Sequence, residues 1–191
     1  MKILFVSSEI SPYAKTGGLA DVSGALPKVL KEMGHDIRLI MPKYSTIDDK
    51  KFNLRYTLKS KQISVPLGEK IEIAKLKRTT LPNSKVPVYF IDNKHYYDRR
   101  ELYVNPKTQK DWEDNAERFI FFNRAVLEVL KLWQWKPQII HCNDWQTSII
   151  PFLLRDHFNN DDFFKDISTL LTIHNIAYQG IFEKEVLKLI G

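Results

Sequence analysis

Short apolar runs, free of polar alternation, recur along this sequence and limit the folds open to it. Residues 2–7, 37–41 and 169–173 are runs of this kind, which is typical of strands covered on both faces. Between the first two runs, apolar residues recur at helical spacing from Leu19 to Met33. These segments form a strand–helix–strand unit, whose crossover is right-handed. The pattern predicts an α/β fold with a Rossmann-like, doubly wound and mainly parallel sheet.

The helix boundaries follow from glycine, proline and the apolar stripe. Gly34 stands where the first helix should end, and Pro27 inside that helix is expected to kink or split it. A long helix over residues 117–133 is apolar on most sides, so it should be largely buried. A strand over residues 138–141 and a helix over residues 145–157 are expected to follow.

The middle of the chain has a different pattern. Residues 63–65 and 71–76 alternate apolar and polar side chains, with Gly68 between them. This predicts an inserted β-hairpin with one face in solvent. Residues 86–91 are again apolar and should return to the main sheet. With no repeat or interdomain linker, residues 1–191 are expected to form one domain.

Composition excludes several classes of function. Hydrophobic residues make up 43% and charged residues 27% of the chain, and the net charge is +6. The lysines between Lys50 and Lys110 are spread among acids, which favours a solvated basic surface over a nucleic-acid interface. One cysteine, Cys142, excludes an internal disulfide and fits a reducing cytosol. No segment is long enough for a signal peptide or a membrane span, so a cytoplasmic protein without membrane contact is predicted.

Polar residues gather where three predicted strands end. The first strand runs into Ser7-Ser8-Glu9 and a loop with Lys15, the strand over residues 138–141 into residues 141–146, and the last strand into residues 174–180. In open α/β sheets, ligands bind beyond the carboxyl ends of the strands. We therefore expect these groups to line one cleft.

The loop around Lys15 offers groups suited to a diphosphate. Gly17 and Gly18 allow close approach of the backbone and positive φ, and the helix starting near Leu19 presents free N–H groups. A plain turn with a surface lysine explains these residues equally well. The loop has neither the dinucleotide-binding nor the P-loop pattern, so a Rossmann dehydrogenase or a P-loop nucleotidase is not supported.

His174 and Asp144 are the other candidates for chemistry. With Asn175 and Gln179 nearby, His174 suits a turn that reads sugar hydroxyls, although a packed histidine at the edge of the core is the simpler alternative. Asp144 should cap the helix that follows it and can serve as a polar ligand as well. The spacing from His141 through Asp144 to His174 gives little support for a metal, and a serine hydrolase elbow is missing. Aromatic residues that either stack on sugars or pack at the edge of the core are Tyr96, Tyr97, Tyr103, Trp112 and Trp145.

Ordered motifs along the whole chain closely resemble the start of bacterial glycogen synthases and plant starch synthases. They are residues 1–30 with Ser8-Glu9 and Lys15-Thr16-Gly17-Gly18-Leu19-Ala20-Asp21-Val22, residues 86–92, Tyr97-Asp98-Arg99, Tyr103, Asp114-Asn115 with Glu117-Arg118-Phe119, residues 141–146 and residues 174–180. The resemblance implies the N-terminal half of a B-type glycosyltransferase fold. The implied reaction moves glucose from ADP-glucose to the non-reducing end of an α-1,4-glucan such as glycogen, with retention and without metal or cofactor.

The resemblance also implies residue roles. Lys15, Gly17, Gly18 and Asp21 would bind the ADP-glucose donor, and His174 and Asp144 would act at the transferred glucose. Tyr103, Glu9, Asn175 and Gln179 would lie on the sugar or acceptor side.

Two departures from the family pattern matter. Asn143 stands where many relatives carry histidine, so this turn departs from the family pattern beside Asp144. The chain ends at Gly191, before the second Rossmann-like domain of a complete synthase, so the isolated segment is expected to be inactive or nearly so. A non-catalytic nucleotide-sugar or glycan-binding module, or a relative using UDP-glucose, are the alternatives.

Overall fold

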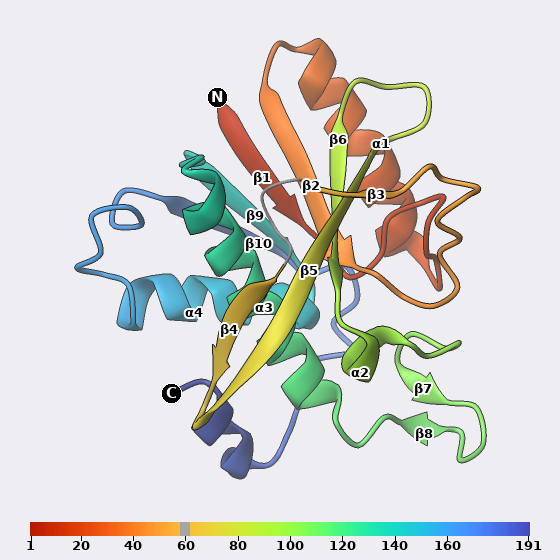
Figure 1. Cartoon of the computed structure of the whole chain (residues 1–191), viewed down its shortest axis with the longest axis vertical. Helices are drawn as coiled ribbons and strands as arrows, with labels where there is room; N and C mark the ends of the chain where they lie inside the picture. Colours follow the sequence, from red (N-terminus) through yellow and green to blue (C-terminus); the bar gives the residue numbers. More distant parts are fainter. Residues whose placement is uncertain (58–61) are drawn as a thin grey trace.

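A parallel sheet forms the centre of the molecule. The computed structural model describes residues 1–57 and 62–191, and the strands in the described part lie in the order β10-β9-β1-β2-β6-β5-β3 (Figure 1). The first five are parallel neighbours. Their bounds are β10 Ser168–Thr172, β9 Ile139–Asn143, β1 Lys2–Val6, β2 Asp36–Pro42 and β6 Pro87–Asp92.

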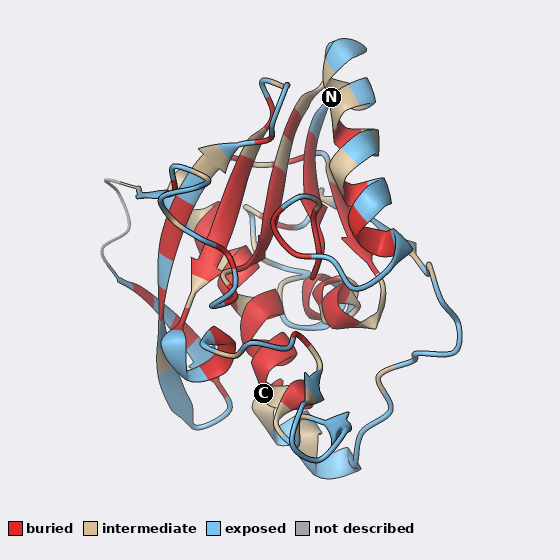
Figure 2. Ribbon diagram, turned by 90° about the vertical axis from the view of Figure 1, so that its right-hand side faces the viewer, coloured by how far each residue is buried: buried red, intermediate tan, exposed pale blue. Residues whose placement is uncertain are grey.

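The strand order reverses between β1 and β9. From β1 the chain builds outward through β2 to β6, then returns to the other side of β1 to form β9 and β10. Right-handed crossovers in two opposite directions place the connecting helices on opposite faces of the sheet. Figure 2 shows α1 (Gly18–Glu32) lying along one face of the strands. The predicted doubly wound α/β fold is confirmed, and its switch point lies between β1 and β9.

Outside the main sheet and α1, the described elements are short apart from one helix. α3, Asn115–Trp133, is largely buried, as its apolar pattern predicts. The helix expected over residues 145–157 is instead a 3-10 turn, η1 at Trp145–Thr147, followed by α4 at Ile149–Asp156. The others are α2 Lys94–Tyr97, β7 Val104–Asn105, β8 Lys110–Asp111 and η2 Lys184–Leu189.

The predicted hairpin is present. β4 (Ile63–Leu67) pairs antiparallel with β5 (Lys70–Thr80), and its side chains alternate between buried and exposed. β5 continues past the hairpin and pairs with both β6 and β3 (Arg55–Tyr56). The hairpin is therefore an extension of the main sheet, and β4 packs against α3.

Pro27 does not split the first helix. α1 is continuous through this residue, which lies on its buried face with Leu19, Ala20 and Ser23. Packing of that face offsets the single hydrogen bond that proline removes. Gly34 ends the segment as predicted: its φ is +88°, and its N–H donates to the carbonyl of Lys31 at 3.0 Å.

The last strand departs from the prediction of a buried strand. Leu170, Leu171 and Ile173 are 50%, 41% and 58% exposed, whereas β1 is buried from Ile3 onward. β10 is the outermost strand on its side of the sheet, so its apolar side chains lack the cover that the central strands have. Apolar sequence alone does not distinguish these two situations.

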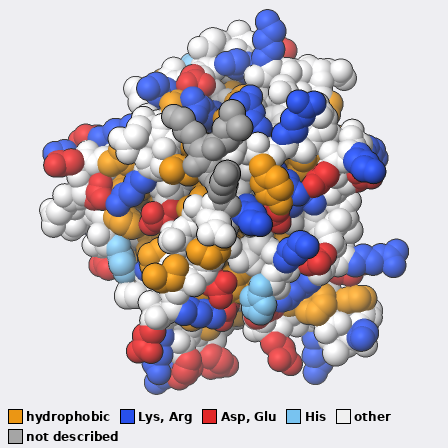
Figure 3. All heavy atoms as spheres, in the orientation of Figure 1, with side chains coloured by type: hydrophobic (Ala, Val, Ile, Leu, Met, Phe, Trp, Pro, Cys, Tyr) orange, Lys and Arg blue, Asp and Glu red, His pale blue; other side chains and the backbone are white. Residues whose placement is uncertain are grey.

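Charges of both signs mix on the surface. Figure 3 shows lysine and arginine side chains interspersed with acidic ones on this face, as the sequence spacing predicts. Within the described ranges, none of the helices is long and apolar enough to cross a membrane.

Candidate functional site

The switch between β1 and β9 is where a ligand crevice is expected. The chain leaves β1 through residues 7–17 and leaves β9 through Asp144, and the end of β10 lies beside the latter. The carboxyl ends of parallel strands share one edge of the sheet, so the loops diverge there and leave room between them. The polar clusters predicted from sequence lie at this edge.

Glu9 organises the loop after β1. Its side chain is 3% exposed. One carboxylate oxygen accepts hydrogen bonds from the Thr16 hydroxyl at 2.7 Å and from the Tyr103 hydroxyl at 2.8 Å, and the other accepts from the Thr16 N–H. Tyr103 also contacts the Ser8 hydroxyl at 2.7 Å. Glu9 and Tyr103, expected on the sugar side, thus form one network that holds the Lys15 loop.

The two glycines of this loop face open space. A Cβ added at Gly17 or Gly18 would meet no atom within 4 Å. Gly17 is extended, with φ −153°, and neither glycine has positive φ, so that part of the prediction is wrong. No side chain caps α1, whose first N–H groups are suited to an anion. The glycines therefore leave room above a helix N-terminus.

Lys15 and Asp21 form an ion pair beside that space. Nζ of Lys15 lies 2.6 Å and 2.7 Å from the two carboxylate oxygens. The side chains are 52% and 57% exposed, and ion pairs this exposed contribute little stability. The ion pair therefore does not fix Lys15 strongly in place. Asp21, as a carboxylate, accepts hydrogen bonds only, and the roles of both residues toward the donor stay predictions.

Asp144 adopts an unusual backbone conformation at the end of β9. Its φ is +59°, a region that residues other than glycine rarely occupy and that is enriched at functional sites. The carboxylate caps no helix. It accepts instead from the His174 N–H at 2.7 Å. The capping prediction is wrong because the carboxylate ties the β9 turn to the chain after β10.

The imidazole of His174 also contacts the end of β9. Its Nε2 lies 2.9 Å from Oδ1 of Asn143, and Asn143 is fully buried. The structure thus joins His174, Asn143 and Asp144 in one cluster.

Asn175 and Gln179 bond within their own turn. Asn175 accepts from the Ala177 N–H at 3.0 Å, and Gln179 donates to the carbonyl of Ile176 at 3.0 Å. Both residues are exposed. These bonds lie within the turn, so both residues stay predictions as ligands.

The turn itself packs on Trp145. Gly180 has φ +63°, and a Cβ there would lie 2.5 Å from a ring atom of Trp145. The Trp145 ring also contacts Phe119 and Phe182, with centroids 5.1 Å and 5.3 Å away. Trp145 therefore acts through packing, and only glycine fits above its ring.

The side chain of His141 contacts residues of the two neighbouring strands. Nε2 lies 2.8 Å from the Thr172 hydroxyl, and the ring contacts Phe5 at 4.8 Å. Burial, with a smaller effect of the charge on His174, lowers the pKa of His141. Across residues 1–57 and 62–191, no cluster of histidine, cysteine or carboxylate side chains is grouped to hold a metal ion.

The other aromatic residues singled out in the sequence are either buried or in contact with neighbouring protein groups. Tyr96 and Tyr97 are fully buried. Nε1 of Trp112 donates to the carbonyl of Glu101, with the guanidinium of Arg99 4.7 Å from a Trp112 ring centroid. These contacts favour the packing alternative for all three.

The sequence of this chain matches a known family over nearly its full length. The family described as "Starch synthase catalytic domain" matches residues 2–191. The chain belongs to this family. Glycogen synthases of Geotalea uraniireducens and Chlorobium phaeobacteroides are each 46% identical over 191 and 180 residues, covering 100% and 94% of this chain. The chain spans 38% and 37% of the length of these relatives.

A solved structure of the starch synthase family has the same fold. The catalytic domain of starch synthase IV from Arabidopsis thaliana, bound to ADP and acarbose, superposes with a TM-score of 0.87 at 30% identity. The match covers all of this chain and 37% of the plant protein. The expected N-terminal half of a B-type glycosyltransferase fold is thereby confirmed.

Three residues that support this candidate site were not predicted. Thr16 bonds Glu9 through both its N–H and its hydroxyl. Arg118, fully buried, donates to the carbonyl of Leu102 at 2.6 Å and so holds the segment before Tyr103. Asn143 was recognised as a departure but not as the partner of His174. Residue type gave no signal for Arg118, because α3 carries several other charged residues.

Proposed function

We propose that residues 1–191 form the donor-side part of a retaining glycosyltransferase that moves glucose from ADP-glucose to the non-reducing end of an α-1,4-glucan. Membership of the starch synthase family carries this proposal, together with the glycogen synthase relatives. Because the chain spans under two fifths of those relatives, the activity belongs to the longer protein. The cytoplasmic location stays a prediction.

The Lys15 loop would hold the diphosphate. Free space over Gly17 and Gly18, an uncapped helix N-terminus and a lysine in an exposed ion pair support this role. Breaking the glucose–phosphate bond leaves negative charge on the diphosphate. Donors already in place around that charge lower the barrier, because they need no rearrangement in the transition state.

The His174 cluster would orient the transferred glucose. Asn143 and Asp144 fix His174 from two sides, and fixed hydrogen-bonding groups favour the reactive geometry. Tyr103 and Glu9 would act by holding the Lys15 loop in place, and Asp21 would orient Lys15. Asn175 and Gln179 are assigned to the acceptor side.

We assign the missing part of the site to the remainder of this domain and to a second Rossmann-like domain, for which the greater length of the relatives leaves room. The exposed apolar side chains of β10 support this assignment, since exposed apolar clusters mark surfaces that another part of a protein covers. Residues 1–191 alone are expected to show little or no turnover.

The test uses the full-length protein and the substitution Lys15→Ala. Loss of a charged hydrogen bond to the diphosphate is worth about 1.5–3 kcal/mol, so kcat/KM for ADP-glucose should fall about 10- to 100-fold. Lys85→Ala removes the same charge from an exposed position elsewhere and should leave the rate unchanged. Equal rates for Lys15→Ala and Lys85→Ala would show that the loop does not bind the donor.

Two further measurements separate the alternatives. Competition between ADP-glucose and UDP-glucose in the full-length protein decides the nucleotide. Tight glycan binding by residues 1–191, with full-length turnover insensitive to His174→Ala, would identify a non-catalytic binding module instead.

A further inference from the structure

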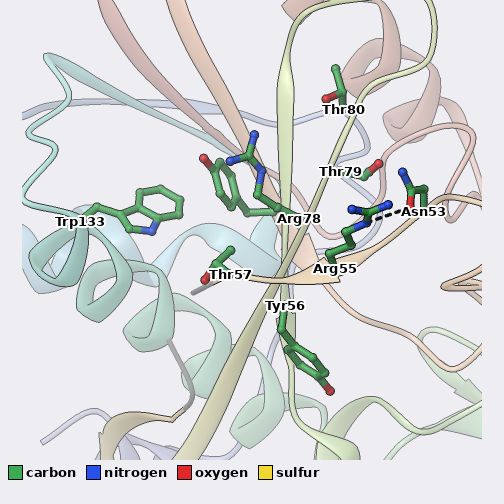
Figure 4. Close-up of a pocket in the computed structure, with 9 residues that line it drawn as sticks. Asn53, Arg55, Tyr56, Thr57, Arg78, Thr79, Thr80 and Trp133 are labelled. Carbon is green, nitrogen blue, oxygen red and sulfur yellow. Dashed lines mark hydrogen bonds between the residues drawn. The ribbon is translucent and has the colours of Figure 1, made fainter. Parts of the chain in front are cut away.

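A cavity lies away from the Lys15 loop. It has a volume of about 690 Å³, and Arg55 of β3, Arg78 of β5, Tyr89 of β6 and Trp133 of α3 line it (Figure 4). In the sheet order, β2 and β6 separate β5 from β1, so this cavity does not lie at the switch point between β1 and β9. Its volume falls within the range of roughly 300–1,000 Å³ typical of small-molecule sites.

Arg55 and Arg78 share one face of the sheet. They are directly opposite in the antiparallel pairing of β3 and β5, and Tyr89 is opposite Arg78 on the next strand. Residues in opposed positions project to the same face, and like charges there repel. In Figure 4, Arg55 turns toward Asn53, whose Oδ1 accepts from its Nε at 3.1 Å, while Arg78 extends away from it.

Neither arginine is neutralised by the protein. In the described ranges, the ion pairs involve neither Arg55 nor Arg78. Residues 58–61 contain no acid, and the cavity lining contains none either. Lys77, on the opposite face of β5, contacts two carboxylates, those of Asp49 and Asp92. Lys77 thus has carboxylate partners, whereas Arg55 and Arg78 are exposed and have none in the described ranges.

An aromatic wall adjoins the two charges. The rings of Tyr89 and Trp133 lie 4.3 Å apart between centroids, and the guanidinium carbon of Arg78 lies 6.0 Å from the Tyr89 ring. Tyr89 is only 8% exposed, so the wall is too covered to be the main contact for a neutral sugar chain. Guanidinium groups bind phosphate through paired hydrogen bonds, which makes an anion the better ligand.

We propose that this cavity, the Arg55–Arg78 site, binds the phosphoryl group of a small phosphate ester. Both side chains are exposed, so the two guanidinium groups can turn from their divergent positions toward one anion, which relieves their repulsion. The organic part of the ester lies toward Tyr89 and Trp133. This site does not depend on the glucosyl-transfer proposal, because it shares no residue with the Lys15 loop.

The test is calorimetric titration of the Lys15→Ala protein, which removes binding at the donor loop. The probes are inorganic phosphate, glucose 6-phosphate and glucose. Glucose 6-phosphate should bind at least about fivefold more tightly than phosphate, and Arg55→Gln or Arg78→Gln should each weaken it about tenfold or more. Arg155→Gln, an equal charge change at an exposed position of α4, should stay within about twofold.

Thermal unfolding supplies a second readout. Without ligand at low salt, Arg55→Gln and Arg78→Gln should unfold at or above the Tm of the parent protein, since each removes one of two opposed charges. Glucose 6-phosphate should raise the Tm of the parent but not of these variants. An equal rise in all proteins, no heat with either phosphate probe, or no gain for the ester over phosphate would overturn the proposal.

Discussion

Oδ1 of Asn143 lies 2.9 Å from Nε2 of His174, and this contact fixes the tautomer of the histidine. The Nδ2 group of Asn143 donates to the carbonyls of Val6 at 3.0 Å and His141 at 3.2 Å. Its amide oxygen must therefore face His174 as an acceptor. The proton of neutral His174 consequently resides on Nε2, which leaves Nδ1 as the acceptor nitrogen.

Asn143→Ala should remove the contact that fixes the tautomer of His174. Loss of one orienting hydrogen bond is worth about 1 kcal/mol, so kcat of the full-length protein should fall about fivefold, with a smaller change in donor KM. ¹⁵N chemical shifts of the imidazole should show the Nε2–H tautomer in the parent protein and a mixture in the variant. An unchanged tautomer in Asn143→Ala would contradict the assignment.

Three glycines allow a matched test of the donor loop. Gly17→Ala and Gly18→Ala should leave stability unchanged or raise it by up to about 1 kcal/mol, because neither Cβ meets an atom and alanine restricts the unfolded chain. Both should raise the donor KM, since the methyl group occupies the space proposed for the diphosphate. Urea unfolding and donor kinetics measure the two effects separately.

Gly24→Ala is the opposite case. Its Cβ would lie 2.8 Å from the carbonyl oxygen of Ser11, so the loop must move and the free energy of unfolding should fall by about 1–3 kcal/mol. If Gly17→Ala destabilises as much as Gly24→Ala, then the first glycine serves packing and not a ligand.

The parts of this fold set by local periodicity could be predicted. Unalternating apolar runs indicated the central strands, the alternation around Gly68 indicated the hairpin, and Gly34 marked a helix end that needs positive φ. The order of polar clusters along the chain also indicated the edge where Glu9 and Asp144 lie. Each of these features depends on residues close in sequence.

The parts set by distant contacts could not be predicted. Aspartate before a helix has the residue type of a cap, and only the position of His174 shows that the Asp144 carboxylate bonds elsewhere. Apolar residues 169–173 have the sequence of a covered strand, yet β10 is exposed because it is outermost. Pro27 is tolerated because its face of α1 is packed.

His141 should make stability depend on pH. Its folded-state pKa is lowered by burial and then by His174, so the unfolded chain binds more protons once the pH falls below the ordinary histidine pKa of about 6.5. Stability from this group is therefore complete above that pH and is lost as the pH falls through the folded-state value.

The measurement is urea unfolding at pH 7.5 and pH 5.5. His141→Gln keeps a donor near Thr172 but does not titrate, so the variant should lose less stability between these two pH values than the parent protein. An equal loss in both proteins would place the pH dependence on other groups.

Gly180 and Gly34 form a pair that separates backbone strain from contact with Trp145. Both have positive φ, +63° and +88°, so alanine should cost about 1–2 kcal/mol of strain at either position. At Gly34 a Cβ meets nothing within 4 Å, whereas at Gly180 it meets the Trp145 ring.

Gly180→Ala must therefore lift the turn from the ring and pull on the bond between His174 and Asp144, so full-length kcat should fall about tenfold. Trp145 fluorescence should also shift to longer wavelength as its ring becomes hydrated. Gly34→Ala should lower the Tm but keep both kcat and the emission maximum. A loss of activity in Gly34→Ala as well would mean that general destabilisation, and not the position of the turn, controls the rate.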